Sequence, residues 1–196
     1  RMDQYKINNI LVSVSNKPSI DVLLPILKEN QVKIWATEGT AKYIREEGME
    51  AQSIVSGFDF DGLVKSLDKL ILARILADKY KPKHLSELKK LASTSSCHPE
   101  LVSGSAAPFS AVVVELYKLD QKNFPESMDV GGVTLIRAAI KNFENVALAY
   151  DRASIKDLTD HLISNQGSTL LRFRKGQAKK AIKFISERCK LEADLF

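Results

Sequence analysis

The stretch Ile10-Leu-Val-Ser-Val-Ser-Asn-Lys-Pro-Ser-Ile-Asp-Val-Leu-Leu-Pro-Ile-Leu27 changes its hydrophobic period partway along, and this change decides the fold. Its first six residues are apolar and partly β-branched, which predicts a strand. From Pro18 the apolar residues recur at helical spacing, and proline suits the first helical position because its missing N–H is not needed there. The stretch therefore predicts strand, turn and helix, the repeating unit of an α/β protein.

The same alternation continues along the first half of the chain. Residues 32–37 are strand-like, and residues 41–47 follow a helical pattern that Gly48 ends. Residues 52–55 predict a third strand, and the apolar residues of 63–75 recur at helical spacing.

The second half repeats the pattern and then becomes helical. Residues 110–117 predict a strand in the middle of a parallel sheet that is covered on both faces. Residues 131–142 predict a helix, 146–150 a strand, and 153–196 two helices. The second of these helices carries an apolar stripe, formed by Leu171, Ala178, Ala181, Ile182 and Ile185. The order predicts a three-layer α/β fold, an open and mainly parallel sheet with helices on both faces, followed by C-terminal helices.

Composition sets the class of protein. The chain has 196 residues, of which 44% are hydrophobic and 27% charged, as expected for one globular domain spanning residues 1–196. These values exclude collagen-like, disulfide-rich and wholly disordered chains. No apolar run approaches the roughly 18 residues that a membrane helix needs, and the first residues do not resemble a signal peptide. We therefore expect a cytoplasmic protein without a membrane partner.

A loop-like segment, the two cysteines and two of the histidines are expected to carry no chemistry. The segment 92–107 lacks periodicity and is rich in Ser, Pro and Gly, which predicts a loop insertion. Cys97 and Cys189 have no second cysteine or histidine at metal-ligand spacing, so we expect free thiols and no metal site. His84 and His161 lie on helical patterns without a cysteine partner and are expected at the surface.

The charge balance is weakly basic. The formal net charge is +5, and a basic chain can indicate a nucleic-acid partner. Here the surplus is small, and basic and aromatic residues are not interleaved as they are in nucleic-acid-binding modules. A surface that attracts phosphorylated metabolites is the alternative, and no nucleic-acid partner is expected.

The turns after the strands are where ligands bind in parallel α/β sheets. In the first, Ser15, Asn16 and Lys17 offer a hydroxyl, an amide and an ammonium group before a predicted helix N-terminus, which favours an anion. The alternative is an ordinary helix cap with a solvated lysine.

Three further turns carry polar residues. Thr37-Glu38-Gly39-Thr40 has the hydroxyls and glycine of a phosphate cradle, but Glu38 would repel a phosphate unless its side chain points away. Lys65 can polarise a substrate oxygen or be an ordinary surface lysine. In the segment 129–142, two adjacent glycines at a helix start allow a close backbone approach, and Arg137 and Lys141 share a helix face. A structural turn and a solvated basic stripe are the alternatives there.

Taken together, five stretches make the chain from Ile10 to Phe196 resemble a known family. They are Leu-Val-Ser-Val-Ser-Asn-Lys (11–17), Thr-Glu-Gly-Thr-Ala (37–41), Val-Lys-Ser-Leu (64–67), Val-Val-Val-Glu-Leu-Tyr (112–117) and Asp-Val-Gly-Gly-Val-Thr-Leu-Ile-Arg-Ala-Ala-Ile-Lys-Asn (129–142). The family is that of the N-terminal inosine monophosphate (IMP) cyclohydrolase domains of bifunctional purine-biosynthesis enzymes, which have a methylglyoxal-synthase-like fold.

The resemblance implies a hydrolase-type ring closure. In that reaction 5-formamidoimidazole-4-carboxamide ribonucleotide loses water and becomes IMP, without a metal or organic cofactor. The implied partners are a purine nucleotide and a second copy of the chain in a homodimer. The formyltransferase domain of these enzymes is expected to be absent from this chain.

The resemblance also implies two sets of site residues. Proton transfer and polarisation are implied for Lys65, Tyr117, Asp129 and Lys141, with Lys141 as proton donor or acceptor. Substrate binding is implied for Ser15, Asn16, Lys17, Thr37, Glu38, Gly39, Thr40, Val64, Ser66, Glu115, Val130, Gly131 and Gly132.

The chain departs from the family in its binding residues. The family usually has Gly at Glu38, Arg at Leu63, Thr at Ser66 and Asn at Glu115. Its stretch Lys-Thr-Leu-His-Pro-x-x-His-Gly-Gly is replaced by residues 65–74, without either histidine or either glycine. Two added carboxylates and one lost arginine weaken the binding of a phosphorylated ligand wherever they face it. The alternative function is therefore a nucleotide-binding or regulatory module that is catalytically weak.

Overall fold

A parallel five-stranded sheet forms the centre of the molecule. The computed structural model describes residues 3–54, 67–94 and 107–196. All neighbouring strands of the sheet run parallel, which confirms the predicted α/β class. Their spatial order is β4 (Gln52–Ser53), β3 (Lys33–Ala36), β2 (Asn9–Val14), β5 (Ala111–Glu115) and β6 (Ala147–Ala149).

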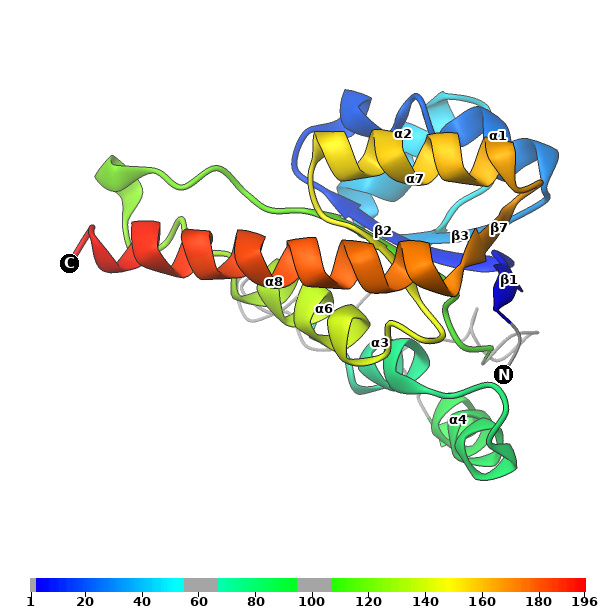
Figure 1. Ribbon diagram of the computed structural model, residues 1–196. Coiled ribbons are helices and arrows are strands. Elements are labelled where there is room, and N and C mark those ends of the chain that lie inside the picture. The colour runs from blue at the N-terminus through cyan, green and yellow to red at the C-terminus, as the bar shows by residue number, and fades with distance from the viewer. Residues whose placement is uncertain (1–2, 55–66, 95–106) are drawn as a thin grey trace.

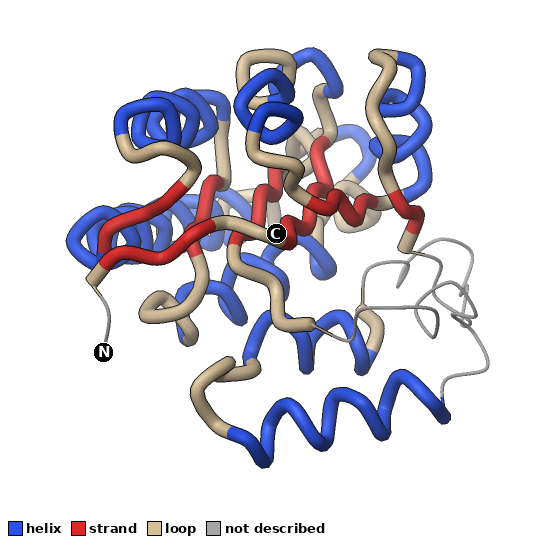
Figure 2. The backbone as a smooth tube through the Cα atoms, turned by 90° about the vertical axis from the view of Figure 1, so that its right-hand side faces the viewer, coloured by secondary structure: helices blue, strands red, loops and turns tan. Residues whose placement is uncertain are grey.

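Helices cover both faces of this sheet, so the predicted three layers are confirmed (Figures 1 and 2). One face packs against α1 (Leu24–Glu29), α2 (Glu38–Glu46) and α7 (Arg152–Ser164). The other packs against α3 (Lys69–Leu76), α6 (Val130–Lys141) and α8 (Leu171–Ala193), and α4 (Pro82–Thr94) packs on α3 farther from the sheet. Two separate apolar cores result, one on each side of the sheet.

The central strands are buried because both of their faces are covered. In β2, Leu11 belongs to the core under α6 and α8, whereas Ile10 and Val12 belong to the core under α1, α2 and α7. In β5, Val112 and Val113 are fully buried on opposite faces. This two-residue alternation with apolar residues on both faces explains the continuous hydrophobic run seen in the sequence.

The prediction of one continuous first helix is wrong, because this segment forms two separate helical elements. The first is the 3-10 turn η1 (Lys17–Ile20). Pro18 is its second residue and thus lies near the helix start, as expected. The α-helix α1 starts only at Leu24, with Pro25 in its first turn. A helix running continuously from Pro18 would place Pro25 in its interior, where proline removes a backbone hydrogen bond and clashes with the preceding turn.

Other boundaries follow the sequence more closely. Helix α2 starts at Glu38 rather than at Ala41, and it ends before Gly48, whose φ of 76° is the left-handed conformation that glycine adopts easily. Helix α6 and strand β6 lie where they are expected.

A second, two-stranded sheet was not predicted. It pairs β1 (Gln4–Lys6) antiparallel to β7 (Ser168–Leu170), so the segment between α7 and α8 is partly a strand.

Helix α8 extends past the sheet. Ala178, Ala181 and Ile185 of the predicted stripe are buried, whereas Ile182 is 43% exposed. The outer half of α8 runs beside the β5–α6 connection, which contains the 3-10 turn η2 (Gln121–Asn123) (Figure 1). Arg188 donates a hydrogen bond of 3.0 Å to the carbonyl of Tyr117, and this contact fixes the start of the connection.

The predicted insertion at 92–107 lies mostly outside the described residues. Its first three residues belong to the end of α4, and residues 95–106, with Cys97 and His98, are not described. At its far end, the carbonyl of Ala107 accepts a hydrogen bond of 2.8 Å from Nε of Arg74. Burial lowers the pKa of this guanidinium to about 9.

Within the described ranges 3–54, 67–94 and 107–196, no helix has the length and apolarity needed to cross a membrane. No cluster of three or more His, Cys, Asp or Glu side chains is placed to hold a metal ion in those ranges.

Candidate functional site

The order of the strands defines the place where a ligand crevice is expected. From β2 the chain continues to β3 and β4 on one side, and β5 and β6 lie on the other side of β2. The boundary between β2 and β5 is therefore the topological switch point, where parallel α/β sheets bind ligands beyond the strand ends. The hydroxyl of Ser15 donates a hydrogen bond of 2.9 Å to the carbonyl of Leu116 across this boundary.

Lys17 joins the first predicted turn to the second. Its ammonium group donates to the carbonyl of Val14. Its Cε lies 3.7 Å from the position that a Cβ on Gly39 would take, at the start of α2. Burial lowers the pKa of Lys17, and the charge of Glu115 raises it. A cation thus lies beside the N-terminus of α2, whose free N–H groups also favour an anion.

Hydroxyl groups hold the ends of β2 and β3 together. Thr40 is fully buried, and its Oγ1 accepts a hydrogen bond of 3.4 Å from the N–H of Val14. The hydroxyl of Thr37 donates to Oγ1 of Thr40 at 3.2 Å. The structure therefore brings Gly39 next to Lys17 and places Thr37 and Thr40 at the end of β2.

The two carboxylates that depart from the family pattern lie differently. The Glu38 side chain is 67% exposed, and its Oε1 lies 3.7 Å from the guanidinium of Arg45 on the same helix. Glu38 is thus directed along α2.

Glu115 faces the first turn. Its Oε2 accepts a hydrogen bond of 2.9 Å from the N–H of Asn16 and lies 3.2 Å from the Ser19 hydroxyl and 3.5 Å from the Ser15 hydroxyl. The single proton of each hydroxyl has a shorter acceptor, the carbonyl of Asn16 at 2.6 Å for Ser19 and that of Leu116 at 2.9 Å for Ser15. Ser19 was missed in the sequence, although a hydroxyl so close to Lys17 is the signal that would have pointed to it.

The fourth turn is fixed by Asp129. This residue is the N-cap of α6, and its carboxylate accepts from the N–H of Gly132 at 2.6 Å and from that of Tyr117 at 3.2 Å. Gly131 and Gly132 are buried, and a Cβ on Gly132 would lie 2.6 Å from Leu116. Val130 is 59% exposed.

The predicted catalytic residues do not all meet. The Tyr117 side chain is 66% exposed near Asp129. Lys141 lies on the last turn of α6, twelve positions after Asp129 in the sequence. At 1.5 Å per residue, these positions are about 18 Å apart along the helix axis. The structure therefore does not bring Lys141 together with Asp129 within one chain.

Three of the predicted residues cannot be placed. Val64, Lys65 and Ser66 fall in the segment 55–66, which lies outside the described residues. Their roles stay predictions.

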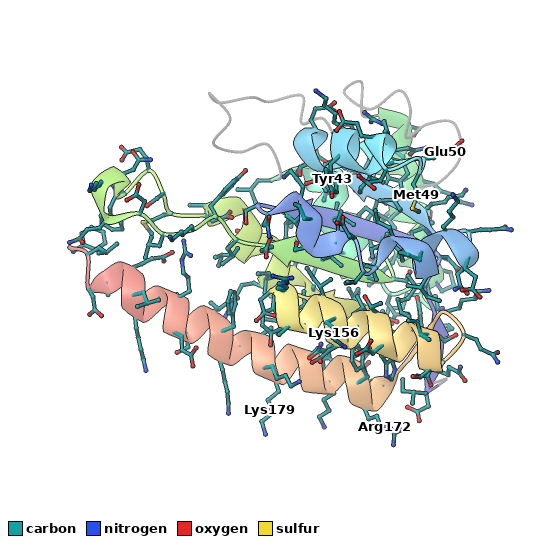
Figure 3. The ribbon with its side chains drawn as sticks, turned by 90° about the horizontal axis from the view of Figure 1, so that it is seen from above. Tyr43, Met49, Glu50, Lys156, Arg172 and Lys179 are labelled. Atoms are coloured by element: carbon teal, nitrogen blue, oxygen red, sulfur yellow. The ribbon has the colours of Figure 1, made fainter. Side chains whose placement is uncertain are left out.

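A separate surface groove of about 430 Å³ lies between α7 and α8. None of the predicted site residues lines it. Figure 3 shows α7 and α8 side by side, with Lys156 on α7 and Arg172 and Lys179 on α8. The charges there are partly paired, since Lys180 lies 3.2 Å from Asp157 and Lys156 lies 2.6 Å from Asp160.

The two histidines are less exposed than predicted. Nδ1 of His84 accepts a hydrogen bond from the N–H of Asp78 at 3.0 Å. His161, at the groove, accepts from the N–H of Leu170 at 3.2 Å and stacks on Phe173 with a centroid distance of 4.0 Å. Both rings therefore satisfy backbone N–H groups, a role that the sequence pattern does not indicate.

The chain forms a parallel α/β domain, and several of its predicted site residues lie at the β2–β5 switch point. Comparison with known families gives the particular group, since the MGS-like domain matches residues 22–144. The chain belongs to the MGS-like domain family, and the fold predicted from the resemblance is confirmed.

Individual relatives narrow the similarity further. The bifunctional purine biosynthesis protein PurH of Clostridium acetobutylicum is 34% identical over 184 residues, which cover 92% of this chain and 36% of that protein. PurH of Bradyrhizobium diazoefficiens is 29% identical over 188 residues, covering 90% of this chain and 33% of that protein. The chain thus spans about a third of the length of these relatives, which fits their N-terminal domain and confirms the predicted resemblance.

A solved structure is also similar. The crystal structure of ForH superimposes with a TM-score of 0.78 and 26% sequence identity, covering 97% of this chain and 99% of that one.

Proposed function

We propose that this chain acts in purine biosynthesis as an IMP cyclohydrolase. The reaction closes the ring of 5-formamidoimidazole-4-carboxamide ribonucleotide. The carboxamide nitrogen attacks the formyl carbon of the same molecule, a C–N bond forms, and water leaves to give IMP. Similarity to the PurH proteins supports the pathway.

One observation carries the proposal. Three of the motif turns, around Lys17, Gly39 and Asp129, lie at the carboxyl ends of β2, β3 and β5. Lys17 and the N-terminus of α2 suit the phosphate of a nucleotide, because both favour negative charge. The base would then extend across the β2–β5 boundary toward Asp129.

The chemistry asks for positioning and proton transfer. Since both reacting groups belong to one molecule, holding them in contact supplies much of the rate enhancement. The Asp129 carboxylate accepts two N–H hydrogen bonds, and a carboxylate has about four lone-pair sites, so it can still accept from a substrate amide. We propose Tyr117 and Lys65 as its companions in polarisation and proton transfer, without a cofactor.

Lys141 needs its own test, because it lies at the far end of α6 from Asp129. Lys141→Ala that abolishes turnover and retains the thermal unfolding transition would keep this residue in the mechanism. Unchanged turnover would remove it. Lys183→Ala, an exposed lysine on α8, is the matched control.

A second candidate function has an observation in its favour. The Glu115 carboxylate already accepts a hydrogen bond from the N–H of Asn16, which the first turn could otherwise give to a phosphate. A site so arranged suits a binding or regulatory module with weak or no turnover.

One assay separates the two functions. The purified chain is mixed with the formylated ribonucleotide, and the formation of IMP is followed against the uncatalysed rate. Product above that rate supports the cyclohydrolase. Product at only the uncatalysed rate overturns it, and binding of IMP without turnover then supports the module.

A homodimer and a cytoplasmic location remain predictions. Leu191 near the end of α8 and Phe196 after it are 57% and 93% exposed, and they offer apolar area for a second copy. Light scattering coupled to gel filtration measures the mass in solution, and a monomer at micromolar concentration would contradict the dimer.

A further inference from the structure

The most distinctive feature of the β2–β5 switch point is a carboxylate that belongs to the protein itself. Glu115 is the last residue of β5, directly at the switch point between β2 and β5. One of its oxygens, Oε2, lies within hydrogen-bond distance of three donors, all from the turn that follows β2. The carboxylate thus crosses the boundary at which a ligand is expected.

These donors are the kind that bind an anion. They are one backbone N–H, from Asn16, and two hydroxyl groups, from Ser15 and Ser19. Backbone N–H groups and hydroxyls before a helix are typical phosphate ligands. Here the Glu115 carboxylate already uses the N–H of Asn16, and the hydroxyl protons of Ser15 and Ser19 have shorter contacts with the carbonyls of Leu116 and Asn16.

The ammonium group of Lys17, the nearby cation, also interacts with Glu115. The charge of Glu115 raises the pKa of Lys17 against the effect of burial, so the carboxylate and the ammonium group interact. By contrast, the other added carboxylate, Glu38, lies next to Arg45 and away from these donors. The effect of added negative charge on the crevice therefore falls on Glu115.

We propose that Glu115 is a specificity-determining residue, a built-in anion that makes the crevice discriminate against phosphate-bearing ligands. A ligand phosphate must either displace the carboxylate from the N–H of Asn16 or bind beside it against like-charge repulsion. An uncharged nucleoside meets neither cost. The inference rests on the proposed function only in its choice of a purine nucleotide as the ligand.

The test compares a nucleotide with its nucleoside. Calorimetric titration at pH 7.5 measures the Kd of IMP and of inosine for the wild type, Glu115→Gln and Glu115→Ala. Gln keeps an oxygen that can accept from Asn16 and Ser19 but removes the charge. Glu46→Gln on the exposed end of α2 removes one charge elsewhere and is the matched control.

For Glu115→Gln we expect the Kd of IMP to fall at least tenfold, about 1.4 kcal/mol, with the Kd of inosine within twofold of the wild type. Glu115→Ala is expected to show the same preference, and Glu46→Gln is expected to match the wild type. Equal changes for IMP and inosine, no change in either, or no IMP binding by any variant would overturn the inference.

Two measurements keep this result separate from the proposed function. Thermal unfolding of each variant shows that the fold is retained, and Glu115→Ala is the second variant if Glu115→Gln does not fold. The turnover assay is read independently. A wild type without turnover, combined with the expected shift in the IMP-to-inosine ratio, rejects the cyclohydrolase and retains the inference.

Discussion

The carboxylate of Asp129 accepts a hydrogen bond of 2.6 Å from the N–H of Gly132, and the two residues are in such close contact that no side chain fits between them. A Cβ on Gly132 would lie 2.8 Å from Oδ2 of Asp129 and 2.6 Å from Cδ2 of Leu116. The same carboxylate accepts from the N–H of Tyr117. The glycine at position 132 thus allows one cap to fix both the start of α6 and the end of β5.

Gly132→Ala is expected to destabilise the protein by about 1–3 kcal/mol, as other overpacked sites do. Either Leu116 or the Asp129 cap must move to make room for the methyl group. Urea unfolding followed by circular dichroism measures the change in the free energy of unfolding.

Gly176→Ala is the matched control for this change. Gly176 lies in α8, and a Cβ there would meet nothing within 4 Å. Alanine is favoured over glycine inside a helix, so this variant should gain about 0.5–1 kcal/mol. A Gly132→Ala variant as stable as Gly176→Ala would contradict the close contact described above.

Asp129 can be tested for two separate roles. Asn is as good an N-cap as Asp, whereas Ala costs about 1 kcal/mol of stability. Asp129→Asn keeps an oxygen for the N–H of Gly132 but loses the acceptor for the N–H of Tyr117, so it should lose less stability than Asp129→Ala.

Turnover distinguishes the second role. If the carboxylate transfers a proton in the ring closure, Asp129→Asn should lose on the order of 100-fold or more in kcat despite its intact fold. An Asn variant with wild-type kcat would limit Asp129 to capping α6.

The elements that the sequence predicted well are those with a strong local period. The first four residues of β5 are apolar because both faces of the strand are buried, and α6 begins at a visible N-cap followed closely by two glycines. Strands β1 and β7 have three residues each and pair Gln4 with Leu170, so no local pattern indicates them. Their formation depends on contacts between distant parts of the chain.

For the site, the sequence predicted positions along the chain but not side-chain directions. Glu38 and Glu115 both adjoin predicted turns, yet one lies next to Arg45 and the other accepts from Asn16. The direction of each depends on which residue its neighbouring element offers. Similarly, Asp129 and Lys141 belong to one motif, although the helix between them separates them by about 18 Å.

The lowered pKa of His161 leads us to expect that the protein loses stability in acid. Burial and the nearby Arg172 and Arg174 lower its pKa in the folded protein, where its ring accepts from Leu170. An unfolded histidine has a pKa of about 6.5, so below that pH the unfolded chain binds a proton that the folded chain binds less well. The free energy of unfolding should therefore decrease as the pH falls below about 6.5.

Urea unfolding at pH 7.5 and pH 5.5 measures this contribution. His161→Gln removes the titrating ring, so its loss between the two pH values should be smaller than that of the wild type. An equal loss in both proteins would show that other groups account for the acid sensitivity.

The lowered pKa of Lys17 leads us to expect that the affinity for phosphate changes with pH in the alkaline range. Burial lowers its pKa, so its positive charge is lost at a lower pH than that of an ordinary lysine, whose pKa is about 10.4. Ribose 5-phosphate is a suitable probe, since it lacks a base that titrates between pH 7.5 and 10. Its affinity should fall within this range, and in Glu115→Gln the fall should begin at a lower pH, because the Glu115 charge raises the pKa of Lys17.

Lys17→Met should bind more weakly at pH 7.5 and lose this pH dependence, whereas Lys28→Met, at the exposed end of α1, should behave as the wild type. A Lys17→Met variant with the wild-type pH profile would remove Lys17 from the phosphate site.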